Sequence, residues 1–99
     1  MILIHGTIRL PPGTLDKAHG AMRAMIEASR AEPGCRHYSY SEDVLDPGLI
    51  HVNELWESRD ALEEHFKAPH IGAWRMRWEE LGISDRKLQS YEIGEPTVV

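Results

Sequence analysis

The sequence predicts an α+β fold in which four strands form one antiparallel sheet and helices cover one of its faces. Three observations support this prediction. Hydrophobic residues alternate along four short segments, as expected of strands with one buried side. Two other regions repeat hydrophobic residues at every third or fourth position, as in amphipathic helices. The order along the 99 residues is β-α-β-β-α-β, which is the split βαβ arrangement.

The first strand is predicted over residues 2–10, because isoleucine or leucine occupies most even positions and marks one buried side. A Pro-Pro-Gly segment at 11–13 ends it, and Thr14 is a suitable N-cap for a helix. That helix carries an apolar stripe and ends at the Glu-Pro-Gly segment 32–34. Proline cannot continue a helix there, and glycine can adopt a left-handed conformation.

A hairpin is predicted next. Residues 35–44 form its first strand, with Tyr38 and Tyr40 on one side, and aromatic residues favour strands. The Leu-Asp-Pro-Gly segment 45–48 is a turn signal, because proline fixes φ and glycine supplies a positive φ. The following strand places four side chains on one side: Ile50, Val52, Glu54 and Trp56.

The second helical region follows directly. Ser58 is expected to cap a short helix in which Leu62 and Phe66 face inward and His65 lies at the flank of that face. Pro69 breaks this helix. A further helix is predicted to begin near His70 and to present one apolar face: Ile71, Trp74, Trp78 and Leu81. The last strand is expected over residues 87–94.

Size and composition restrict the function. A chain of this length makes one domain, expected over residues 1–95 with a tail at 96–99. The net charge of −5 argues against nucleic acid and membrane surfaces as partners. No transmembrane segment or secretory signal is expected, and the single Cys35 fits a reducing compartment, so we expect a cytoplasmic protein.

The predicted sheet has a second face that the helices do not cover. Its side chains are too apolar to be fully hydrated and too polar for an intrachain core: Leu3, His5, Thr7, His51, Asn53 and Leu55. Pairing this face with a second copy of the chain would bury it, and a C2 homodimer is the simplest symmetric solution.

Several motifs together resemble the antibiotic biosynthesis monooxygenase family, including its quinol monooxygenase members. They are the Glu-Pro-Gly-Cys segment 32–35, the Tyr38 strand, the Asp-Pro-Gly turn at 46–48, Glu54-x-Trp56, and the helix with His65 followed by Pro69-His70. The resemblance implies a dimeric α/β barrel in which two ferredoxin-like sheets pack face to face. It also implies a substrate cavity between sheet and helices in each subunit.

The resemblance further implies oxygenation of a quinol or a polycyclic, anthrone-like phenol by dioxygen without flavin, haem or metal. An electron-rich phenolate can itself give an electron to dioxygen, so the protein supplies a dry pocket and a route for the proton. His65 is the expected proton acceptor, since the ordinary histidine pKa of about 6.5 suits transfer near neutrality. The expected substrate-binding residues are Glu54, Trp56, Tyr38, Tyr40, His70, Trp74, Arg75 and Trp78. Where a characterised member carries an amide, this chain has Val52.

Other interpretations of these residues stay open. His65 also fits a helix-flank histidine bonded to Glu54 or to backbone, and the tryptophans fit a core. A non-catalytic dimeric barrel that binds a hydrophobic small molecule is the alternative function, and an isomerase is a third. No cofactor is expected. No metal is expected either, because no pair of histidines has ligand spacing on one element.

Overall fold

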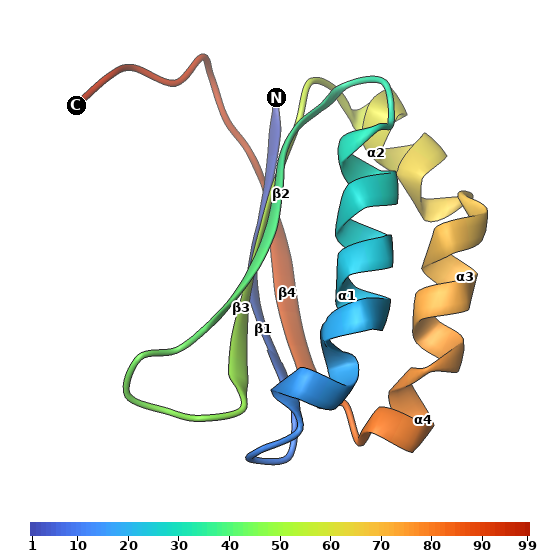
Figure 1. Cartoon of the computed structure of the whole chain (residues 1–99). Helices are drawn as coiled ribbons and strands as arrows, with labels where there is room; N and C mark the ends of the chain where they lie inside the picture. Colours follow the sequence, from blue (N-terminus) through green and yellow to red (C-terminus); the bar gives the residue numbers. More distant parts are fainter.

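The computed structural model describes residues 1–99 and has two layers, a four-stranded antiparallel sheet and a layer of helices (Figure 1). The strands are β1 (Ile2–Arg9), β2 (Cys35–Glu42), β3 (Leu49–Trp56) and β4 (Ser84–Glu92), in the order β2-β3-β1-β4. The helices are α1 (Leu15–Arg30), α2 (Arg59–Phe66), α3 (Pro69–Met76) and α4 (Trp78–Leu81). The predicted α+β class and its element order are confirmed.

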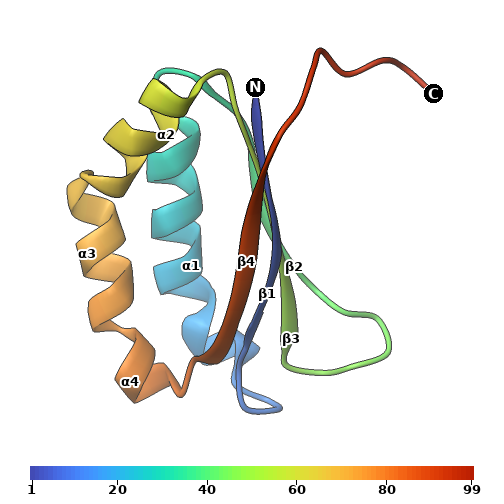
Figure 2. The ribbon, with the colours of Figure 1, turned by 180° about the vertical axis from the view of Figure 1, so that it is seen from behind.

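The helices lie on one side of the sheet only, as both views show (Figures 1 and 2). The core between the layers contains the even-numbered residues of β1, among them Ile2, Ile4 and Ile8, against Met22 and Met25 of α1. This alternation is the one that the sequence predicts. None of the helices combines the length and the apolar character that crossing a membrane requires.

The uncovered face of the sheet carries paired residues of β1 and β3. Leu3 lies opposite Leu55, and His5 lies opposite Asn53 with 2.9 Å between Nδ1 and Oδ1. The two leucines are only partly buried. Within one chain, therefore, this face has hydrogen-bonded polar groups beside apolar side chains that nothing covers.

The local signals at turns and caps act largely as predicted. The Ser58 hydroxyl accepts a hydrogen bond from Ala61 N at 3.1 Å and caps α2. Gly48 has a φ of 91°, as the turn before β3 requires. Thr14 occupies the N-cap position of α1, but its side chain does not cap the helix, because its hydroxyl donates to the carbonyl oxygen of Pro11 at 2.7 Å.

Several predicted boundaries are wrong. β2 ends at Glu42, so Val44 and Leu45 lie exposed in the loop that extends beyond the sheet. β4 begins at Ser84, three residues earlier than predicted. The helix expected to run through Leu81 is broken at Arg77, whose N–H donates to the Trp74 carbonyl in a tighter turn. The turn redirects the chain so that α4 can bury Leu81.

The inward face of α2 also differs from the prediction. Leu62 is buried as expected, but Phe66 is 55% exposed and His65 only 3% exposed. His65 and Phe66 follow Leu62 by three and four positions, so they lie on either side of the same helical face. Packing of α2 against β3 selects the i+3 position, because the His65 ring lies on the Trp56 indole with 4.4 Å between ring centroids.

Candidate active site

A cavity of about 200 Å³ lies between the sheet and helices α2 and α3. Seven of the residues predicted for the site line it: Tyr38, Tyr40, Glu54, His65, Trp74, Arg75 and Trp78. Two do not: Trp56 lies fully buried behind the wall, and His70 lies beside Glu32 on the other side of His65. Most of the residues proposed for the site therefore surround one cavity.

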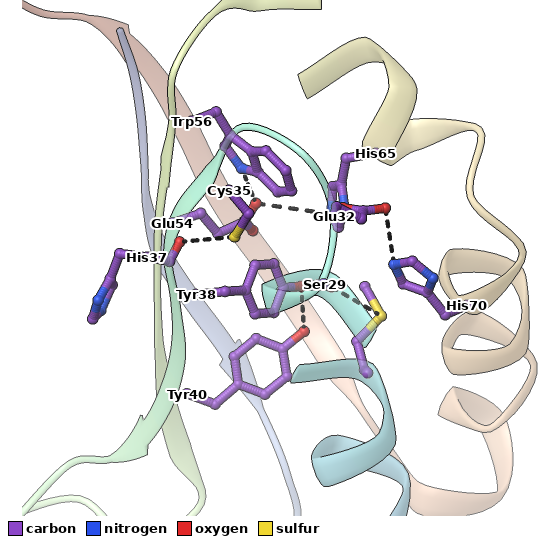
Figure 3. Close-up of polar contacts among 11 residues, drawn as sticks. Ser29, Glu32, Cys35, His37, Tyr38, Tyr40, Glu54, Trp56, His65 and His70 are labelled. Atoms are coloured by element: carbon purple, nitrogen blue, oxygen red, sulfur yellow. Dashed lines mark hydrogen bonds and ion pairs between the residues drawn. The ribbon is translucent and has the colours of Figure 1, made fainter. Parts of the chain in front are cut away.

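Two tyrosines of β2 form part of the sheet side of the cavity. Tyr38 and Tyr40 point the same way because they are two residues apart, and their hydroxyl oxygens are 2.9 Å apart (Figure 3). Burial raises the pKa of both hydroxyls above the ordinary tyrosine value. Both therefore keep their protons at neutral pH. One hydrogen is used in the bond between them, and the other can be donated to an oxygen in the cavity.

Glu54 and Trp56 satisfy each other at the end of β3. The indole Nε1–H donates to Glu54 Oε1 at 3.0 Å, and the Glu54 side chain remains on the cavity surface (Figure 3). Burial raises the pKa of Glu54, and the hydrogen bond from Trp56 opposes that rise. Glu54 is thus both hydrogen-bonded within the chain and exposed to the cavity.

His65 is held between two carboxyl groups. Its Nδ1 lies 2.6 Å from Glu32 Oε2, and its Nε2 lies 3.9 Å from Glu54 Oε1, which is beyond hydrogen-bond length. With Glu32 ionised, Nδ1–H donates to it and Nε2 keeps a free lone pair. The imidazole is therefore fixed in one tautomer and orientation, the arrangement that a general base requires.

The acidity of His65 differs from the sequence-based expectation. Burial, followed by the charge of His70, lowers the pKa of His65 from 6.5 to about 4. The side chain is thus neutral throughout the physiological range and ready to accept a proton. Its acceptance of a proton depends on the nearby Glu32 carboxylate, which can stabilise the imidazolium once it forms.

This shift predicts how the free energy of unfolding depends on pH. His65 binds a proton near pH 6.5 in the unfolded chain but only near pH 4 in the folded chain. The folded state therefore has its full stability above pH 6.5, and the free energy of unfolding decreases as the pH falls from 6.5 towards 4. We expect a contribution of about 3 kcal/mol. Urea denaturation of wild type and His65→Gln at pH 4 to 7 measures it, with exposed His19→Gln as control. Parallel pH curves for wild type and His65→Gln would contradict it.

Glu32 was not among the site residues predicted from the sequence. It lies in the turn after α1, and its second oxygen, Oε1, is 3.0 Å from Nε2 of His70 (Figure 3). Burial raises the pKa of Glu32, and His70 opposes this. The sequence marks the Glu-Pro-Gly segment only as the end of a helix and as part of the family resemblance.

Glu32, His65 and His70 together offer three ligand atoms of the kinds that zinc binds, all within 4.8 Å of one another. No ligand pattern within one helix or strand predicts this group, because its residues come from three different parts of the chain. Two ligands of a tetrahedral zinc ion lie roughly 3.3 Å apart. The 2.6 Å between His65 and Glu32 is a hydrogen-bond distance, so this pair shares a proton as it stands.

The helix side of the cavity is aromatic and carries a cation. Trp74 lies between Tyr40 and Trp78, with ring centroids 5.9 Å and 6.0 Å away. The Arg75 guanidinium lies 4.7 Å from the centroid of the Trp78 ring, a cation–π distance. Three aromatic rings and a cation suit a flat aromatic ligand with a polar end.

The comparisons with known proteins identify related chains. The family model described as antibiotic biosynthesis monooxygenase matches residues 1–77. The protein sll1783 of Synechocystis is 30% identical over 94 residues, which cover 95% of this chain and 64% of that one. "Putative monooxygenase Rv0793" of Mycobacterium tuberculosis is 40% identical over 68 residues, which cover 65% of this chain and 66% of that one. The chain thus spans slightly less than two thirds of the length of these two relatives.

Solved structures agree with the family match. A "putative antibiotic biosynthesis monooxygenase" from Deinococcus radiodurans has a TM-score of 0.90 at 27% identity, covering 100% of this chain and 98% of that one. PA3566 from Pseudomonas aeruginosa has a TM-score of 0.78 at 31% identity, covering 94% and 93%. The structure of Rv0793 has a TM-score of 0.75 at 28% identity, covering 98% and 96%.

Proposed function

The chain belongs to the antibiotic biosynthesis monooxygenase family, and from this we propose that it is a cofactor-independent monooxygenase acting on a quinol or related phenol. The observation that supports the proposal most is His65, whose Nδ1 is held by Glu32 while the imidazole lines an aromatic cavity. The single Cys35 fits the further expectation that the protein acts in the cytoplasm.

The chemistry assigns one task to each group. Nε2 of His65 accepts the proton of a substrate hydroxyl, and the phenolate so formed gives an electron to dioxygen. Oxygen joins a ring carbon as a peroxide. Loss of the hydrogen on that carbon breaks the O–O bond, leaving one oxygen on the ring and releasing the other as water. A quinol thus supplies all four electrons and becomes a hydroxyquinone. Tyr38 and Tyr40 are hydrogen-bonded to each other, and the one hydroxyl hydrogen that this bond leaves free donates to a substrate oxygen.

The size of the cavity favours small substrates. A dry protein cavity of roughly 150 Å³ holds benzene. The cavity of about 200 Å³ therefore suits one or two rings better than the three rings of an anthrone. Within the class of electron-rich phenols we accordingly propose a quinol of one or two rings.

Glu32 has a positioning role in this proposal. In Glu32→Gln the side chain keeps its size and can still accept from Nδ1, but its charge no longer stabilises the imidazolium. We expect kcat to fall by at least about tenfold with little change in KM. The acid limb of the pH–rate profile should move to lower pH, because His65 becomes a weaker base. Exposed Glu64→Gln is the control, and an unchanged profile in Glu32→Gln would contradict the role.

We also propose that two copies pair through the uncovered face of the sheet, where Leu3 and Leu55 lie. Light scattering after size exclusion should give about twice the 11.3 kDa chain mass. Leu55→Arg places a charge on this face and should shift the protein to monomer. A wild-type monomer at micromolar concentration would refute the pairing.

The experiment that tests the function is oxygen uptake by purified protein with a panel of reduced quinones and anthrones. The expected result is uptake above the autoxidation rate, with hydroxylated product in equal amount, for one or more small quinols. Uptake at the autoxidation rate across the panel would refute the oxygenase. If panel compounds then bind without reaction, the alternative of a non-catalytic binding barrel follows. Turnover without oxygen would indicate an isomerase.

A further inference from the structure

Two of the eight arginines have no acidic or backbone partner, and both line the cavity. They are Arg75 of α3 and Arg86 of β4. The other six each bind a carboxylate or a carbonyl: Arg9, Arg23, Arg30, Arg36, Arg59 and Arg77. In a chain with sixteen acidic residues and a net charge of −5, two arginines left unpaired at one cavity indicate a place for an anion.

The two cations also act on each other. Burial lowers the pKa of Arg75, and the charge of Arg86 lowers it further. Beside them, the indole Nε1 of Trp78 is buried without an acceptor. Like charges at a partly enclosed site are unfavourable until a counter-charge neutralises them. This part of the cavity therefore has donors and positive charge, and neither arginine forms an ion pair with Glu54, the one acidic residue of the lining.

The backbone of Arg86 and the His65 imidazole lie at different levels of the cavity, although the charge of Arg86 still acts on Glu54 and opposes the rise that burial causes in its pKa. In the sheet, Glu54 of β3 pairs with Ile4 of β1, which pairs with Ser90 of β4. Arg86 is four residues before Ser90, roughly 13 Å along the strand from the level of Glu54. His65 lies at the level of Glu54 and Trp56. An elongated ligand can reach both levels.

We infer that Arg75 and Arg86 form a subsite for a carboxylate on the substrate, so that the substrate is a phenolic aromatic acid. The ring lies along Tyr40, Trp74 and Trp78, the hydroxyl meets His65, and the carboxylate meets the guanidinium groups. Guanidinium donors match the two oxygens of a carboxylate. The orientation of the hydroxyl rests on the proposed function, whereas the anion subsite does not depend on catalysis.

The test is a binding measurement with a matched pair of probes, 6-hydroxy-2-naphthoate and its neutral carboxamide, by isothermal titration at pH 7. These share a ring system and hydroxyl and differ in charge. We expect wild type to bind the acid at least about tenfold more tightly than the amide. Arg86→Gln and Arg75→Gln should each remove most of this preference. Added salt should weaken binding of the acid alone.

Lys87→Gln is the matched control, because Lys87 follows Arg86 on β4, carries the same charge and does not line the cavity. It should keep the wild-type preference. Equal binding of the acid and the amide by wild type would overturn the subsite. The same result is expected if the arginines bind a phenolate and not a carboxylate. Equal losses in Lys87→Gln and Arg86→Gln would also overturn the subsite.

The two proposals fail separately. A preference for the acid without oxygen uptake from any quinol would keep the subsite and refute the oxygenase. Uptake from quinols with no preference for the acid would do the reverse. Circular dichroism of each variant shows whether a loss of binding comes from unfolding. If Arg86→Gln does not fold, Arg86→Lys, which keeps the charge but not the planar fork, should retain part of the preference.

Discussion

Replacing His65 with glutamine should lower kcat by about 10²- to 10⁴-fold, the range that a positioned general base contributes. Glutamine approximates the size of the side chain and can bond Glu32, but it cannot take the substrate proton. The imidazole contributes this step because Glu32 holds Nδ1 and leaves Nε2 free. The measurement is oxygen uptake with the best quinol of the panel, corrected for autoxidation.

Two controls separate chemistry from folding. His19→Gln changes an exposed histidine of α1 and should leave kcat unchanged. Binding of a non-reacting phenol to His65→Gln should stay within a few-fold of wild type, since aromatic contacts remain. A fully active and folded His65→Gln would show that the histidine is structural and that another group accepts the proton.

Gly6→Ala should be the most disruptive single methyl addition in the chain. A Cβ at Gly6 in β1 would overlap the carbonyl oxygen of Lys87 and the Cα of Leu88 in β4. Both obstacles are backbone atoms, so the strain is relieved only if the two strands separate. We expect a loss of about 3 kcal/mol or more in the free energy of unfolding. Because Leu88 lines the cavity, substrate binding should weaken as well.

Gly20→Ala provides the matched control. Gly20 is an exposed residue inside α1, and nothing lies within 4 Å of where its Cβ would be. Alanine should therefore stabilise the helix by about 0.5 to 1 kcal/mol. Urea denaturation of both variants measures the contrast. A Gly6→Ala protein as stable as wild type would show that β1 and β4 are less tightly held than their pairing indicates.

The sequence predicts the fold well because each strand has one buried side. Alternation in β1 and β3 identifies the residues that face the helices, among them Ile4, Val52 and Glu54. The sequence does not predict which of two adjacent helical residues is buried where only tertiary packing decides between them. His65 and Phe66 occupy adjacent positions of one helical face, and only the presence of Trp56 decides which is buried.

The candidate site is predicted less completely, for a similar reason. Glu32 contacts His65 across 33 positions of sequence, and no local pattern records that contact. Arg86 could have been found from periodicity, since it shares its side of β4 with Leu88. The sequence predicts this strand only from residue 87, so the predicted pattern does not include Arg86.

The bond between the Tyr38 and Tyr40 hydroxyls has no fixed direction, because either oxygen can donate. If Tyr38 donates, the hydrogen of Tyr40 is free for a carbonyl; if Tyr40 donates, its lone pair is free for a hydroxyl. Rotation of two hydrogens, without movement of a heavy atom, lets one wall accommodate a quinol and a quinone equally. Substrate and product should then compete at similar concentrations, so that accumulated product slows turnover by occupying the site.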